Sequence, residues 1–156
     1  MKTNILVFLL ILCANILNAQ TFDETKKSAE QGDARAQFNL GLMYDTGEGT
    51  LTDKKQAIYW YKKSAEQGFA EAQYNLGFMY YTGEGTLTDK KQAFYWYKKS
   101  AEQGYADAQL SFGIMYYWGY GTLTDKKQAA FWIRKSYENG CAKAKEIWDK
   151  LELYKY

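Results

Sequence analysis

The chain repeats one sequence of 36 residues three times without a gap. Residues 28–63 are the first copy, residues 64–99 differ from it at six positions, and residues 100–135 differ from the second copy at twelve. Residues 136–156 begin a fourth copy, and residues 21–27 match the end of a copy before the first. Repetition at a fixed period of roughly 20–50 residues is typical of solenoids, in which stacked units share one core.

Each copy predicts two helices joined by a loop that contains two glycines. In the first copy, apolar residues spaced three and four apart predict a helix from Ala34 to about Tyr44. The glycines of the loop are free to take positive φ angles. Asp53 is placed to cap a second helix, with Gln56 completing a capping box, and Gly68 is placed to end that helix.

A glycine recurs in the middle of the first helix, at Gly41, Gly77 and Gly113. Glycine in a helix interior costs about 1 kcal/mol relative to alanine. Its repetition therefore predicts a neighbouring helix that approaches too closely for a Cβ atom. The aromatic residues that are invariant among the copies are predicted to be core packing: Trp60, Trp96, Trp132, Tyr44, Tyr80 and Tyr116.

The copies share the phrase Ala-x-Ala-Gln-x-Asn-Leu-Gly-x-Met-Tyr-x-x-Gly-x-Gly, or a close variant of it, followed by Asp-Lys-Lys-Gln-Ala and a Trp-containing segment that ends each unit. This pattern resembles the Sel1-like repeat, a relative of the tetratricopeptide repeat, over residues 28–135 and both end fragments. The resemblance implies an all-α fold, a right-handed α/α superhelical solenoid with a concave face. It also implies an interaction adaptor, of a family often exported by bacteria.

The two end fragments are predicted to cap the array. Residues 20–32 are expected to form an N-terminal capping helix, in which Glu24 stands where the full copies have tryptophan. Residues 136–156 are expected to form a partial repeat and a C-terminal capping helix, in which Asp149 replaces the mid-helix glycine and Glu152 replaces a tyrosine. Charged groups suit the outer faces of a finite solenoid.

Residues 1–19 have the pattern of a secretory signal peptide. Lys2 precedes an unbroken apolar run over residues 5–12, and the small residue Ala19 precedes a polar one. The run is much shorter than the roughly 20 residues that a membrane-spanning helix needs, so we expect no permanent membrane anchor. We expect cleavage near Ala19 and an exported protein, either periplasmic or secreted. Lipidation of Cys13 is the weaker alternative, because bulky Leu12 precedes it.

Composition argues against most catalytic chemistry. The chain has no histidine, which removes the usual general base and the commonest metal ligand. A net charge of +2 is too small to indicate nucleic acid. The glycine loops lack both a phosphate-loop ending and the carboxylates of a calcium site. We therefore predict no catalytic residue, no cofactor and no metal, and we expect Cys141 to be a buried apolar residue.

Differences between the copies identify a candidate partner-binding surface. Four of the six substitutions between the first two copies are spaced by 3, 4 and 3 residues, which places them on one stripe of the first helix. In tetratricopeptide-like folds this helix lines the concave face, so we predict a groove that binds a protein or peptide. The candidate residues are Arg35, Phe38, Asp45, Glu71, Tyr74, Phe78, Tyr81, Asp107 and Tyr117. Leu42, Leu110 and Ile114 complete the stripe.

Three alternatives remain open. The stripe can reflect drift of exposed positions after duplication, with no partner involved. The chain can instead bind cell-wall glycan or a β-lactam-like ligand, with or without weak hydrolase activity. A cysteine-rich branch of the family is linked to β-lactam binding or hydrolysis, and its repeats carry a cysteine pair that these repeats lack. The protein can be a monomer or a weak dimer joined through its end caps. The recurring lysine pairs, beginning with Lys54 and Lys55, are predicted to form a solvated convex rim.

Overall fold

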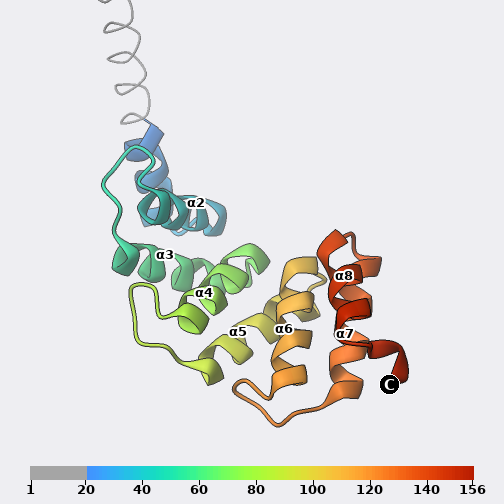
Figure 1. Ribbon diagram of the computed structural model, residues 1–156. Coiled ribbons are helices and arrows are strands. Elements are labelled where there is room, and N and C mark those ends of the chain that lie inside the picture. Colours follow the sequence, from blue (N-terminus) through green and yellow to red (C-terminus); the bar gives the residue numbers. More distant parts are fainter. Residues whose placement is uncertain (1–20) are drawn as a thin grey trace, which may run out of the picture. The chain divides into compact units, whose positions relative to one another are not determined.

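The computed structural model describes residues 21–156, and in that part of the chain it contains helices and no strand (Figure 1). The predicted signal peptide, residues 1–19, lies outside the described residues. Between residues 21 and 156, every helix is too short or too polar to cross a membrane.

The helices follow the order and the pairing that the repeats predict. Residues 21–30 are helical. They are followed by α2 (Ala34–Thr46), α3 (Lys54–Glu66), α4 (Ala70–Thr82), α5 (Lys90–Glu102), α6 (Ala106–Trp118), α7 (Lys126–Glu138), α8 (Ala142–Lys150) and the short 3₁₀ helix η1 (Leu153–Lys155). We call α2, α4 and α6 the first helices, and α3, α5 and α7 the second helices. The fold is the predicted all-α solenoid of helix–turn–helix units.

The described part of the chain divides into two compact units, residues 21–64 and residues 65–156. In the described part of the first unit, the helical segment 21–30, α2 and α3 enclose a core that contains Ala29, Leu40 and Trp60. In the second unit, each first helix makes its most extensive contact with the second helix of its own repeat, α4 with α5 and α6 with α7.

An aspartate fixes the start of each second helix. The carboxylate of Asp53 accepts hydrogen bonds from the backbone N–H groups of Lys55 (3.0 Å) and Gln56 (3.1 Å), as predicted for an N-cap. The reciprocal half of the predicted capping box is wrong, because the backbone N–H of Asp53 is donated to the carbonyl of Tyr44 (2.8 Å). The same bond recurs from Asp89 to Tyr80 and from Asp125 to Tyr116. It ties the end of each loop back to the first helix.

The mid-helix glycines lie against the second helix of the same repeat, as predicted. A Cβ atom added to any of them would approach the neighbouring side chain more closely than real Cβ atoms do. The first atoms that it would meet are Cδ1 of Tyr61 at Gly41 (2.6 Å), Cδ1 of Tyr97 at Gly77 (2.8 Å) and Cγ1 of Ile133 at Gly113 (2.6 Å). The two helices of each repeat are therefore in direct contact at the middle of the first helix.

Buried hydrogen bonds set the register within and between repeats. The hydroxyl of Ser100 is fully buried and donates to the carbonyl of Ala70 (2.7 Å), which joins the second helix to the start of the first. The side-chain amide of Gln73 donates to the carbonyl of Ala65 (3.0 Å), which joins the first helix to the second helix of the preceding repeat. Equivalent bonds recur in the other repeats: Ser64 to Ala34, Ser136 to Ala106, Gln37 to Ala29 and Gln109 to Ala101.

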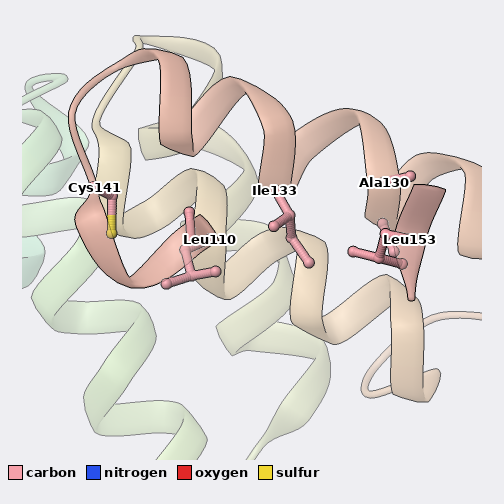
Figure 2. Packing of buried hydrophobic residues seen from close by; sticks show 7 residues of the cluster. Leu110, Ala130, Ile133, Cys141 and Leu153 are labelled. Carbon is pink, nitrogen blue, oxygen red and sulfur yellow. The ribbon is translucent and has the colours of Figure 1, made fainter. Parts of the chain in front are cut away.

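The C-terminal end of the second unit has its own core between α6, α7 and α8. Figure 2 shows Leu110, Ile133 and Leu153 lying along this core, with Cys141 at its edge. Cys141 is buried, as predicted. Leu153 belongs to η1, which folds back against α7 and covers Ala130. The helices of the partial repeat, α8 and η1, thus both pack against α7.

We expect Gly77→Leu to lower the free energy of unfolding by about 1–3 kcal/mol, because the added side chain displaces the ring of Tyr97. Urea denaturation followed by circular dichroism measures this change. Gln92→Leu on the exposed face of α5 adds the same side chain without a steric conflict and serves as the control. Equal midpoints for Gly77→Leu and the native chain would contradict the close-contact explanation of the glycine.

Candidate functional site

In the first unit, the predicted stripe residues lie on α2. Phe38 packs on Tyr61 with ring centroids 5.9 Å apart. The carboxylate of Asp45 forms an ion pair with the ammonium of Lys54 (2.5 Å) and accepts a hydrogen bond from the hydroxyl of Tyr61 (3.3 Å). Arg35, also a candidate residue, is exposed. Asp45 is therefore held by intramolecular partners.

In the second unit, the stripe residues of two neighbouring repeats surround one pocket. Tyr74, Phe78 and Tyr81 of α4 line it from one side, and Ile114 and Met115 of α6 line it from the other. The pocket is open, has a volume of about 210 Å³ and is lined mainly by apolar atoms. Three of the nine candidate residues are thus brought together.

The remaining candidate residues of this unit flank the pocket without lining it. Glu71 lies in the first turn of α4, and Asp107 lies in the first turn of α6. Tyr117 is at the opposite end of α6, where its ring makes an edge-to-face contact with Trp118, with centroids 4.9 Å apart. These residues place charge at one end of the surface and aromatic rings at the other.

Tyrosine hydroxyls and one serine form the polar part of the pocket. Ser111 lies beside both Tyr74 and Tyr97 in the lining of the pocket. Burial raises the pKa of Tyr97 far above its usual range. Burial, and then the negative charge of Asp107, raises the pKa of Tyr74. Both phenols are therefore neutral at physiological pH, and they offer fixed hydrogen-bonding groups on an otherwise apolar wall.

The first lysine of each second helix reaches toward the end of the stripe. The ammonium of Lys90 lies 3.2 Å from the ring centroid of Tyr81 and donates to the carbonyl of Tyr81 (2.5 Å). Burial lowers the pKa of Lys90. The ammonium of Lys126 lies 4.9 Å from the ring centroid of Tyr117. At the equivalent positions of the first repeat, Lys54 forms its ion pair with Asp45. These three lysines do not belong to the solvated convex rim that the sequence predicted.

Aromatic surface continues from the pocket into the loop of the third repeat. The rings of Tyr81 and Tyr120 have centroids 6.1 Å apart, and Trp118 is 56% exposed. In contrast, Trp60 and Trp96 are only 7% exposed, which confirms that they are core packing. The exposed rings next to the pocket, Trp118 and Tyr120, are therefore at positions that differ between the copies.

Within the described residues, no three side chains of the metal-ligating types lie together. The thiol of Cys141 lies 3.4 Å from a carboxylate oxygen of Asp107. Among the described residues around the pocket, we identify no nucleophile paired with a base. The pocket thus offers a ligand hydrogen bonds and apolar contacts.

Sequence reasoning missed three of the residues that line the pocket. Tyr97, Ser111 and Met115 were not singled out. A signal was present for Ser111, because the other two copies have asparagine at that position. No comparable signal marks Met115, which is the same in all three copies.

Helix pairs at 36-residue spacing, with an apolar pocket between the first helices α4 and α6, define an α-solenoid. The chain belongs to the Sel1 repeat family, whose model matches residues 34–69, 70–105 and 106–141. Each match begins at a first helix. Sel1 repeat proteins are generally protein-interaction modules.

Solved structures share this fold. A Sel1 repeat protein from Oxalobacter formigenes is 36% identical over 81% of this chain and 58% of that chain, with a TM-score of 0.72. The protein c5321, a protective antigen present in uropathogenic Escherichia coli strains, is 42% identical over 76% of this chain and 26% of that chain, with a TM-score of 0.74. Cysteine-rich protein B of Helicobacter pylori, at 22% identity, a TM-score of 0.64 and coverage of 81% and 96%, shows the fold alone.

The chain thus spans 58% and 26% of the lengths of the first two proteins. No curated protein matches it in sequence.

We expect the free energy of unfolding to fall as the pH rises above about 10, partly because of Tyr97. The pKa of Tyr97 is raised in the folded state, so its phenol ionises at a lower pH in the unfolded chain than in the folded chain. Ionisation therefore stabilises the unfolded state relative to the folded state as the pH rises. Tyr97→Phe should reduce the alkaline slope by up to about 1.4 kcal/mol per pH unit. Urea midpoints measured between about pH 8 and pH 11 test this, with Tyr95→Phe on the exposed face of α5 as the control. An unchanged slope for Tyr97→Phe would contradict the assignment.

Proposed function

We propose that this protein is an exported, non-catalytic interaction module that holds a peptide segment of a partner protein against α4 and α6. The pocket between these helices carries the proposal. The residues that differ among the copies are concentrated there, and they include Tyr74, Phe78 and Ile114. Partly exposed aromatic side chains around an apolar pocket are typical anchors at protein interfaces.

The size of the pocket favours a side chain of a larger partner over a separate small molecule. Sites for drug-sized ligands usually have volumes of about 300–1,000 Å³. The volume here is about 210 Å³, and the pocket is open on one side. One aliphatic or aromatic side chain of a bound segment fills it, while the hydroxyl groups of Tyr74 and Ser111 bond to the backbone of that segment.

Charges at the two ends of this surface give the bound segment a direction. Glu71 and Asp107 lie where α4 and α6 begin, whereas Lys90 and Lys126 lie beside the ends of the same helices. Complementary charge fixes the orientation of a partner. The partner segment is therefore a single apolar anchor with a basic group on the acidic side and an acidic group on the lysine side.

Binding of cell-wall glycan is a second candidate function, and exposed Trp118 is the observation that favours it. Its indole presents a flat apolar face beside Tyr117. Trp118 lies outside the pocket, so substitution of Trp118 separates the two functions from one another.

Export rests on the pattern of residues 1–19. A chain recovered from the periplasm or the medium with a mass that begins near Gln20 supports it. A full-length chain that stays in the cytoplasm contradicts it.

Site-specific photo-crosslinking tests the position of the partner. We expect a photoreactive amino acid at Phe78, which is 42% exposed at the pocket, to capture a discrete partner protein in the producing cells. Mass spectrometry then identifies the captured segment, which should carry an apolar anchor. A synthetic peptide of that segment should bind the native chain at least about tenfold more tightly than it binds Phe78→Ala, because an interface anchor contributes at least about 1.4 kcal/mol.

The matched control places the photoreactive group at Tyr95, which has similar exposure on α5 but lies outside the pocket. The same crosslinks from both positions would contradict the proposed surface. Equal binding of the peptide to Phe78→Ala and to the native chain would do so as well. Loss of glycan binding in Trp118→Ala, with no peptide bound at Phe78, would instead support the second candidate.

A further inference from the structure

The described chain has half of a repeat at each end. We call residues 21–32 the N-terminal half-repeat, because they match the C-terminal part of a second helix. Residues 26–32 read Lys-Lys-Ser-Ala-Glu-Gln-Gly, which is identical to residues 62–68 and 98–104. We call residues 142–156 the C-terminal half-repeat, because they begin with α8, which matches a first helix.

A complete repeat shows how two such halves fit together. In the third repeat, α6 and α7 are joined by four contacts. These are the hydrogen bond from Ser136 to the carbonyl of Ala106 (2.7 Å), the hydrogen bond from Asn139 to Gln109 (2.9 Å), the ring contact of Phe112 with Trp132 (5.1 Å) and the close approach of Gly113 to Ile133.

The C-terminal half-repeat presents the first-helix side of this contact to solvent. Lys145, Trp148 and Asp149 stand at the positions of Gln109, Phe112 and Gly113, which are buried in the third repeat. Here Lys145 and Asp149 are exposed and Trp148 is only partly buried. Together with Arg134 and Tyr137 of α7, they line an open pocket of about 260 Å³.

The N-terminal half-repeat carries the second-helix side of the same contact. Glu24, Thr25, Ser28 and Gln31 stand at the positions of Trp132, Ile133, Ser136 and Asn139. Ser28 is partly exposed, whereas Ser64, Ser100 and Ser136 are all fully buried at the equivalent position.

We propose that these two half-repeats, from two copies of this chain, join head to tail and complete a repeat between them. The substitutions at the two ends compensate for one another in size. Asp149, which is larger than the glycine of a full repeat, faces Thr25, which is smaller than the isoleucine or tyrosine. Trp148, which is larger than phenylalanine, faces Glu24, which is smaller than tryptophan.

The charges also match. The guanidinium of Arg134 lies 5.3 Å from the ring centroid of Trp148, the side chain that Glu24 faces in this joint, so the joint brings opposite charges to the same aromatic ring. Lys145 donates to the side-chain carbonyl of Gln31, and Ser28 donates to the carbonyl of Ala142, as Ser136 does within the chain. The contact is heterologous, so it extends into longer chains of copies unless it closes into a ring.

Sedimentation of the protein in the form that the producing cell makes, with its N-terminus read by mass spectrometry, tests the proposal. We expect the average mass of the native protein to rise with concentration. Arg134→Glu and Glu24→Arg each place like charges at the joint and should weaken self-association about tenfold or more. The double variant Glu24→Arg/Arg134→Glu, and an equal mixture of the two single variants, should restore it.

Both substituted residues are exposed, and circular dichroism establishes that the variants fold. Lys98→Glu makes the same charge change at the position of α5 that matches Arg134, and it should leave self-association unchanged. A native protein that stays monomeric at all concentrations would overturn the proposal. Self-association that Glu24→Arg leaves intact would also overturn it, because that result indicates contact between two identical ends. Failure of the double variant to recover self-association would overturn it as well.

Discussion

The direct contact between the two helices of each repeat determines the rest of the structure. A glycine at the centre of each first helix allows a tyrosine or isoleucine of the second helix to lie where a Cβ would be. A buried serine hydroxyl at one end of the pair, as at Ser100, and an aspartate N–H at the other, as at Asp89, hold the two helices in one register. These contacts recur in all three repeats, whereas the side chains of the stripe differ between them.

The candidate site is built on this contact between the two helices. Tyr97 fills the space at Gly77, and its ring also lines the pocket. On the other side, α6 has the shorter side chains Ser111 and Ile114 where α4 has Asn75 and Phe78. The pocket thus lies between two neighbouring repeats whose backbones are alike and whose side chains differ in size. Sel1 repeat proteins generally use such scaffolds to bind proteins.

The helices, their caps and the glycine contacts could be predicted from the sequence, because each depends on local spacing repeated three times. The stripe on the first helices could also be predicted, but the choice of Tyr74, Phe78 and Tyr81 as the residues that meet at one pocket could not. That choice depends on which side chains face them from the next repeat. The position of Lys90 was missed for a related reason, since a long side chain on α5 is free to reach toward α4 or toward solvent.

Methyl NMR of isoleucine-labelled protein, titrated with a peptide selected from a random library for binding to this chain, tests the account most directly. Ile114 lines the pocket, whereas Ile147 lies in the C-terminal core. A saturable shift of the Ile114 methyl signal, with Ile147 unchanged, is the predicted result. A shift at Ile147 with Ile114 unmoved would place the bound peptide elsewhere and contradict the account.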